Sequence, residues 1–422
     1  MLLETEFLKA QAPGAVFVST LALLGLFVLR EALFQPIQDH GYPSPVVRVS
    51  PYELDISDID AVKEIHRVGG HYRKADFYNN IGHRSIKTLF STTDPHYHAI
   101  RRRLLSAGMA HTNLSTVEPL VYDRLQLTMN QMASEMRRRG VVDVFKWWTF
   151  MATDVIGELS FGQSFQTLEH GEKTQYVRDL ENVSSFMAVR VTFPKLVEYS
   201  SFFPIPILRR VQQAGGRMAQ YAQRAIKNYQ SMIDKNPENP KQTLFTKMFN
   251  SGPDGLTLAE ITPEAGGYIV AGSDTTAITL TYLVWAVCRN PAIRDKLVAE
   301  VNTLPSDFNK DHIRDLPFLN QVIHEALRLH SAVPSALPRA VPKEGATLAG
   351  YNIPGGITVS TQAYTLHRNA DVFPEPQSFD PSRWEEPTKE MKHVFMPFGG
   401  GSRNNSSVTG VVFWSLIEED EE

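Results

Sequence analysis

The chain has 422 residues, of which 42% are hydrophobic and 21% are charged, and this mixture excludes a mainly disordered protein. Lysine and arginine number 42 against 46 aspartates and glutamates, and five of those acids form the run 418–422, so the rest is close to neutral and a general nucleic-acid surface is not expected. The single cysteine, Cys288, excludes an internal disulfide and any zinc or iron–sulfur site built from several cysteines.

The first predicted element is an apolar segment, residues 10–29, that carries no charge. As a helix it would extend about 30 Å, which is the thickness of the hydrocarbon core of a bilayer. We therefore predict a transmembrane anchor. Arg30 and Arg48 follow the segment while only Lys9 precedes it, which favours a body on the cytosolic side. The alternatives are a buried core helix and a cleaved signal peptide, although two glutamates near the N-terminus do not suit a signal peptide.

The body that follows reads mostly as helices. Residues 45–56 have the pattern of a strand followed by a turn, and apolar residues between 58 and 330 then recur mostly at the 3.6-residue period of amphipathic helices. The region 346–366 differs, because short β-prone runs flank Pro354-Gly355-Gly356, and this pattern predicts a hairpin at that turn. We expect a mainly α-helical fold with a small β region.

A long central helix is predicted from about Pro263 to Arg289, with Thr262 as its N-cap and Pro291 beyond its end. Its middle, residues 271–277, reads Ala-Gly-Ser-Asp-Thr-Thr-Ala. A glycine costs about 1 kcal/mol inside a helix, and the polar side chains compete for backbone hydrogen bonds. The segment indicates either a kinked surface helix or a place where a bulky group approaches the backbone and an acid beside an alcohol delivers protons.

The C-terminal third contains two motifs built on arginine. Glu325 and Arg328 stand three residues apart, so they share one side of a predicted helix and can pair. On its own such a pair is an ordinary surface ion pair worth about 0.5 kcal/mol. The second motif, Phe379–Trp384, reads Phe-Asp-Pro-Ser-Arg-Trp and contains Arg383.

A glycine run follows in residues 395–403, which read Phe-Met-Pro-Phe-Gly-Gly-Gly-Ser-Arg. Three glycines after an aromatic segment indicate either a flexible turn or a close approach of the backbone to another group. A phosphate-binding loop is the obvious rival, but it requires Lys followed by Ser or Thr at its end, and Ser402-Arg403 does not supply that pair.

Taken together, in this order and spacing, the motifs resemble those of the cytochrome P450 family, the haem-thiolate monooxygenases, and especially its fungal membrane-bound members. The resemblance covers residues 42–403. It implies that the cofactor is haem. It also implies that Asp274 and Thr275 are the acid and the alcohol that deliver protons to iron-bound dioxygen.

The same resemblance assigns the remaining site residues. Glu325, Arg328 and Arg383 would form a buried structural network behind the haem. Arg102 would face a haem propionate, as guanidinium groups commonly do, although a solvated basic helix face is the alternative for residues 101–103. The expected haem-binding residues are His98, Arg102, Arg339 and Arg403.

The chain departs from the family at the iron ligand. In the family the glycine loop continues with one residue and then a cysteine, whose thiolate binds the iron and favours O–O cleavage. Here Asn405 occupies that position, so no metal ligand is assigned. Cys288 lies roughly 20 Å along the central helix from the two threonines and is expected to be a small buried hydrophobe. Ligation by His330 or His393 would not give monooxygenase electronics.

Residues 404–422 form an acidic tail that does not resemble the family. One explanation is read-through past a splice site near Arg403, in which case the true protein continues as the family does. The other is a genuine shorter product that is inactive as a monooxygenase. The abrupt change in the middle of a motif favours the first explanation.

We therefore expect a cytochrome P450 fold, incomplete at its C-terminus and anchored by a single pass in the endoplasmic reticulum membrane, with its body in the cytosol. The implied function is hydroxylation of an apolar small molecule in fungal secondary metabolism, of the terpenoid or polyketide class, with electrons from NADPH-cytochrome P450 reductase. No nucleic-acid partner is expected. The alternatives are a haem-free, inactive membrane protein of the same fold and a soluble helical scaffold.

Overall fold

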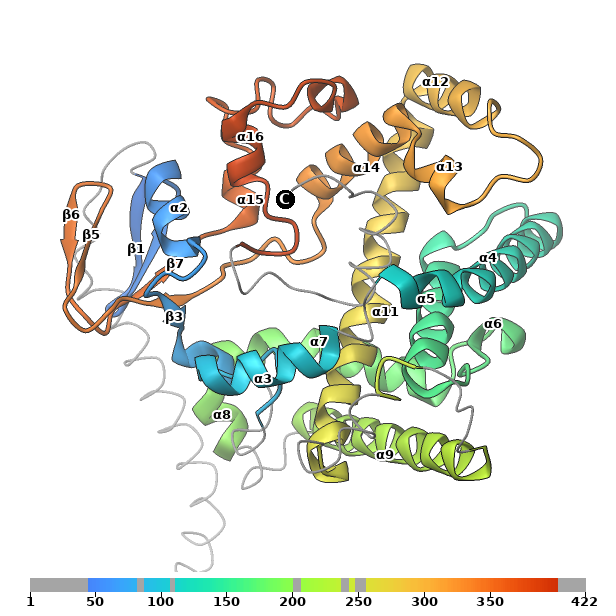
Figure 1. Cartoon of the computed structure of the whole chain (residues 1–422), viewed down its shortest axis with the longest axis horizontal. Coiled ribbons are helices and arrows are strands. Elements are labelled where there is room, and N and C mark those ends of the chain that lie inside the picture. Colours follow the sequence, from blue (N-terminus) through green and yellow to red (C-terminus); the bar gives the residue numbers. More distant parts are fainter. Residues whose placement is uncertain are drawn as a thin grey trace, which may run out of the picture.

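The computed structural model describes residues 45–81, 87–106, 111–199, 206–236, 243–246 and 256–400, and these form a helical body with small sheets at one side (Figure 1). The helices are α2 (Ile59–His66), α3 (Pro95–Ser106), α4 (His111–Arg139), α5 (Val144–Phe161), α6 (Thr167–His170), α7 (Gln175–Thr192), α8 (Pro194–Tyr199), α9 (Pro206–Lys235), α11 (Leu258–Arg289), α12 (Pro291–Val301), α13 (Lys310–Arg314), α14 (Pro317–His330), α15 (Ala363–Leu366) and α16 (Lys389–Val394). The 3-10 helices are η1 (Asp76–Asn80) and η4 (Pro381–Trp384). The strands are β1 (Val46–Ser50), β2 (Glu53–Ile56), β3 (Arg73–Lys74), β4 (Arg339–Ala340), β5 (Ala346–Leu348), β6 (Tyr351–Ile353) and β7 (Thr358–Ser360). The predicted fold class is confirmed.

The central helix α11 runs through the helical body and packs against α5, α9 and α14 (Figure 1). It starts earlier than predicted, because Thr257 rather than Thr262 is its N-cap. The Glu260 carboxylate accepts hydrogen bonds from the backbone N–H and the hydroxyl of Thr257, at 2.9 and 2.8 Å. This capping arrangement satisfies donors at the helix start, so the helix begins before Pro263 and carries that proline inside it.

The largest apolar core gathers around α5, whose residues are almost all buried. The rings of Trp147 and Phe150 meet there edge to face, with centroids 5.7 Å apart. Asp154 of the same helix is also buried, and its carboxylate accepts the backbone N–H groups of Thr167 and Leu168 at 3.0 and 2.9 Å. Because these are the first N–H groups of α6, the carboxylate caps that helix and fixes it to α5.

The larger sheet combines strands from the N-terminal and the C-terminal thirds of the chain. Its strand order is β1-β2-β7-β4-β3, with β2 and β7 parallel and the other neighbours antiparallel. Leu54 of β2 lies opposite Val359 of β7, and both side chains are buried in one apolar cluster. The strand predicted within residues 45–56 is present, and it forms the hairpin β1–β2 together with a second strand.

The predicted hairpin around Pro354-Gly355-Gly356 is wrong in its position. Strands β6 and β7 flank that turn, but β6 pairs with β5 while β7 joins the larger sheet. The hairpin turn is Ala349-Gly350, where both residues have positive φ, as a two-residue turn between antiparallel strands requires. At Gly355 an added Cβ would lie 2.3 Å from the Lys343 carbonyl oxygen, so the chain crosses the preceding loop closely and moves on to the other sheet.

Within the described ranges, no helix is both long enough and apolar enough to cross a bilayer. The predicted anchor, residues 10–29, and the acidic tail, residues 404–422, lie outside these ranges. Both therefore stay predictions.

Candidate functional site

Glu325 and Arg328 of α14 form a buried pair, with 0% of either side chain exposed. The arginine Nε donates to Oε2 and its Nη2 donates to Oε1, each at 2.8 Å. The alternative of an ordinary surface ion pair is therefore wrong. Removing one partner of such a pair costs about 3–5 kcal/mol, because the other charge stays buried without compensation.

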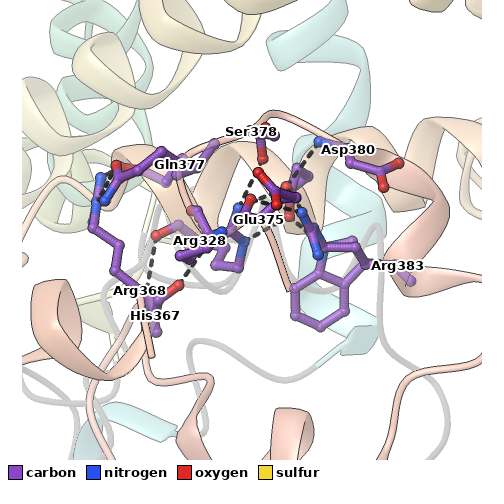
Figure 2. A network of polar contacts seen from close by, with 12 residues as sticks. Arg328, His367, Arg368, Glu375, Gln377, Ser378, Asp380 and Arg383 are labelled. Atoms are coloured by element: carbon purple, nitrogen blue, oxygen red, sulfur yellow. Dashed lines mark hydrogen bonds and ion pairs between the residues drawn. The ribbon is translucent and has the colours of Figure 1, made fainter. Parts of the chain in front are cut away.

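The remaining N–H groups of Arg328 donate to backbone carbonyls that come later in the chain (Figure 2). Nη1 donates to His367 at 2.6 Å and to Pro376 at 2.8 Å, and Nη2 donates to Ser378 at 3.1 Å. A guanidinium has five N–H donors, and these three bonds with the two to Glu325 employ all of them. The side chain thus fastens α14 to the irregular segment that follows α15.

Glu325 receives further donors from the region of η4. The Asp380 backbone N–H donates to Oε1 at 2.9 Å, and the Trp384 indole Nε1 donates to Oε2 at 3.0 Å. Arg383 lies beside them, with its Nε 3.4 Å from Oε1 and its Nη2 donating to the Glu375 carbonyl at 2.9 Å. The structure thus brings together the three residues predicted to form this network. It adds Trp384, which stands in the same sequence motif but was not singled out.

The predicted acid and alcohol, Asp274 and Thr275, lie partly buried in the middle of α11. Burial raises the pKa of Asp274; the Ser184 hydroxyl opposes this shift and the Glu181 carboxylate adds to it. Both neighbours belong to α7, so the acid faces that helix. The Thr275 hydroxyl donates to the Ala271 carbonyl at 2.7 Å, one turn earlier in its own helix. A carboxyl with a raised pKa keeps its proton closer to neutral pH, as a proton donor must.

In α3 the buried arginine is Arg101 rather than Arg102. Arg101 is 2% exposed, and its Nη2 donates to the Tyr97 hydroxyl and to the Glu260 carboxylate, each at 2.7 Å. The alternative of a solvated basic face is therefore wrong for this residue. Arg102 is partly buried, and His98 of the same helix is buried.

Another buried carboxylate, Glu264, lies one turn after Glu260 in α11. It is 2% exposed and accepts the Leu89 backbone N–H at 2.7 Å. Burial raises the pKa of Glu264 to about 7, although that hydrogen bond and the charges of Arg101 and Lys74 lower it. A carboxyl with this pKa exchanges its proton near neutral pH. Sequence reasoning missed it because a single glutamate in a helix carries no motif.

Arg339, predicted to bind haem, lies in β4 and is 4% exposed. Its Nη1 donates to the Tyr78 hydroxyl at 3.1 Å and to the Pro338 carbonyl at 3.2 Å. Burial, helped by the charge of Arg339, lowers the pKa of His66 in α2 to about 3. The His66 Nε2 is 2.7 Å from the Thr361 hydroxyl. Arg339 and its cross-strand neighbour Lys74 thus supply positive charge in this region, while His66 stays neutral.

The described chain reaches its last residues in the glycine run, where a close approach was predicted. Gly399 has a φ of +93°, which favours glycine. A Cβ added to Gly400 would lie 3.1 Å from the His66 ring and from the Met396 sulfur. A larger residue at this position would have to displace both groups.

The described residues include a donor that fits a haem propionate, but none of them supplies a thiolate ligand for the iron. Arg101 Nη1 is buried and has no hydrogen-bond partner within the described ranges, and such a donor fits an absent anionic group such as a propionate. Cys288, the only cysteine, is exposed on α11 and not buried as expected. The described part of the chain contains no group of three or more His, Cys, Asp or Glu side chains that could hold a metal ion. The predicted haem residue Arg403 and Asn405 lie outside it.

Comparison with known proteins points to one family. The family model described as Cytochrome P450 matches residues 38–404. The chain is 56% identical to cytochrome P450 monooxygenase tazI of Aspergillus terreus, over 86% of this chain and 75% of that protein. It is 48% identical to cytochrome P450 monooxygenase orf2 of Aspergillus niger, over 86% and 74%, and 34% identical to cytochrome P450 monooxygenase stcB of Emericella nidulans, over 86% and 71%. The family match stops one residue before Asn405.

Proposed function

Because the chain belongs to the cytochrome P450 family of haem-thiolate monooxygenases, we propose that it hydroxylates an apolar small molecule of fungal secondary metabolism, a terpenoid or a polyketide. The observation that carries this proposal is the buried network of Glu325, Arg328 and Arg383. It lies behind the segment that leads to the glycine run, in a chain whose central helix carries an acid with a raised pKa. The similarity to fungal monooxygenases supports the class of reaction.

The described residues have distinct parts in this reaction. Haem, when bound, supplies the oxidising chemistry. Asp274 would be the proton donor, which its raised pKa favours, and the hydroxyl of the next residue, Thr275, is oriented by the Ala271 carbonyl. Arg102 and Arg339 would hold the acidic groups of the cofactor by charge, and the Nη1 of Arg101, unpaired among the described residues, could donate to one of them. The Glu325 network would keep the segment beside the cofactor rigid.

The proposal includes the cellular setting. The anchor at residues 10–29 would hold the protein in the endoplasmic reticulum membrane, with the domain at 42–403 in the cytosol, where NADPH-cytochrome P450 reductase supplies electrons. The length and apolarity of the segment support this placement. A fusion that lacks residues 1–30 tests it, because the protein should then leave the membrane fraction; unchanged localisation would favour the soluble helical scaffold.

The second candidate is a haem-free, inactive membrane protein of the same fold. Two observations favour it for the sequence as it stands. Asn405 stands where the family has its cysteine, and Cys288 is exposed on α11. In this form the scaffold network would persist without a cofactor to support.

One spectrum separates the two candidates. The full chain is expressed with the reductase and supplied with a haem precursor, and the reduced, carbon-monoxide-bound form is recorded beside Asn405→Cys. The monooxygenase proposal requires from the unmodified chain the red-shifted Soret band that thiolate ligation produces, together with oxidation of apolar test compounds. No such band in this chain, with the band present in Asn405→Cys, would overturn it in favour of the second candidate. Transcript sequencing across codon 404 then decides how the tail arises.

A further inference from the structure

His367 follows α15, is fully buried, and lies beside Arg328 in the network of polar contacts (Figure 2). Its Nδ1 is 2.9 Å from the Arg328 carbonyl oxygen. Its Nε2 accepts the Met396 backbone N–H at 2.8 Å. The Phe395 ring stacks on the imidazole, with centroids 5.4 Å apart. One side chain therefore contacts two segments that are far apart in sequence.

The two partners determine the state of the ring. A carbonyl oxygen can only accept, so Nδ1 must carry the hydrogen, and a backbone N–H can only donate, so Nε2 must present its lone pair. The imidazole is thus neutral and in a single tautomer. Protonation at Nε2 would place an N–H against the Met396 N–H and break that bond. Burial also favours the neutral imidazole, because it lowers the pKa of His367 to about 3, and the charges of Arg328 and Arg368 add to this effect.

The contact with Arg328 is reciprocal. The Arg328 Nη1 donates to the His367 carbonyl at 2.6 Å, while the His367 ring donates to the Arg328 carbonyl. The next residue, Arg368, donates from Nη2 to the Leu329 carbonyl at 2.6 Å. Both accepting carbonyls belong to the last turn of α14, whose carbonyls have no partner within the helix. His367 and Arg368 therefore cap α14.

We propose that His367 is a positioning residue that sets where residues 395–400 lie relative to α14. Its ring is a rigid spacer: one nitrogen is fixed to the capped helix end and the other to Met396, three residues before Gly399. The placement of the glycine run then follows from the same helix that carries Glu325 and Arg328. Only the consequence for haem binding rests on the proposed monooxygenase function.

Two amide variants separate the two bonds. In His367→Asn the amide NH₂ takes the place of Nδ1, which keeps the donor to Arg328 and loses the acceptor for Met396. In His367→Gln the longer side chain brings its amide oxygen to the place of Nε2, which keeps that acceptor. His367→Phe removes both bonds. His393→Asn is the matched control, because His393 also bonds a backbone carbonyl through Nδ1, at 2.6 Å from Lys389, but is exposed.

The test is amide hydrogen exchange of the full chain without added haem, read by mass spectrometry on a peptide spanning 395–400 and on one from α5. We expect exchange in 395–400 to be about tenfold faster in His367→Asn and His367→Phe, and close to the unmodified chain in His367→Gln and His393→Asn. The α5 peptide should be unchanged in the amide variants.

Equal protection at 395–400 in His367→Asn and His367→Gln would overturn the proposal, because a purely space-filling role treats the two amides alike. If His367→Phe alone loses protection throughout the chain, that variant is unfolded, and the comparison of His367→Asn with His367→Gln decides the question. Because the measurement needs no haem, its result is independent of the spectrum described above. If the unmodified chain binds haem, His367→Asn should also release it faster than His367→Gln does.

Discussion

Two buried arginines, each in a different region of the molecule, differ in how many of their N–H donors have a hydrogen-bond partner. Arg328 uses all five of its N–H donors on Glu325 and on backbone carbonyls. Arg101 is almost as deeply buried, yet its Nη1 has no hydrogen-bond partner within the described ranges, and its acid partner Glu260 is 44% exposed. Arg328 is therefore satisfied by the chain alone, while, among the described residues, the buried Nε of the neighbouring Arg383 makes only the 3.4 Å ion pair with Glu325. The region between α3 and α11 has donor capacity left for a ligand.

The largest effect expected from this contrast concerns Arg328→Ala. The change leaves the Glu325 carboxylate buried without its partner, so the free energy of unfolding should fall by about 3–5 kcal/mol. Urea unfolding measures it. The matched change Arg101→Ala should cost about 1–2 kcal/mol, because half-exposed Glu260 can return to water and one donor is already unpaired. Equal losses in the two variants would remove the distinction between the regions.

The next largest effect is the pH dependence of the free energy of unfolding that arises in the region between α3 and α11. The pKa of Glu264 is about 7 in the folded protein against 4.5 for an ordinary glutamate, so the folded state binds more protons between these values. Stability contributed by this group is therefore lost as the pH rises from about 4.5 to about 7. Glu264→Gln should remove that slope, with a difference on the order of 2 kcal/mol between about pH 5 and about pH 7.5.

Urea unfolding of both proteins at the two pH values checks this, with Glu260→Gln as the control. Hydrogen bonds from Thr257 lower the pKa of Glu260, so its contribution grows as the pH rises through the acid range and is complete well below pH 7. If the free energy of unfolding changed with pH in the same way in the unmodified chain and in Glu264→Gln, the raised pKa of Glu264 would be contradicted. Of these two carboxylates, Glu264 is the one expected to make stability depend on pH near neutrality.

The smallest effect tests how completely the network behind the glycine run is satisfied. Trp384→Phe keeps the ring but removes the indole donor to Glu325 Oε2, leaving three other donors on that carboxylate, from Arg328 and from the Asp380 backbone. The loss should be about 1 kcal/mol in thermal or urea unfolding. A loss as large as that of Arg328→Ala would show that the donors act as one cooperative unit rather than separately.

Several features of the fold were predictable because they depend on residues close together in sequence. The pairing of Glu325 with Arg328 follows from a three-residue spacing on a helix, and the central helix and the strand at 45–56 follow from their periodicity. The predicted start of α11 was wrong. Pro263 was taken as the first helical residue, but the capping by Thr257 and Glu260 sets the start. The hairpin was predicted in the wrong place because the pairing of β7 depends on β4, a strand that is not adjacent to it in sequence.

Other parts of the site could not be predicted, since the deciding contacts lie far apart in the chain. Which of Arg101 and Arg102 is buried depends on how α3 meets α11, and Glu260 is 159 residues from Arg101. The raised pKa of Glu264 comes from burial by segments that no local pattern identifies. His367 binds partners 39 residues before it and 29 residues after it, and nothing near it in the sequence marks it.

The sequence by itself determined the family, the helical character of the body and the identity of the arginine network, because spacing and residue type encode these locally. It also established that position 405 is an asparagine and that the chain has only one cysteine. Only the tertiary structure decided which polar groups are buried, which carbonyls Arg328 holds and which ring ties Met396 to α14. Burial and hydrogen-bond partners are properties of the assembled chain, and they arise when segments distant in sequence exclude water together.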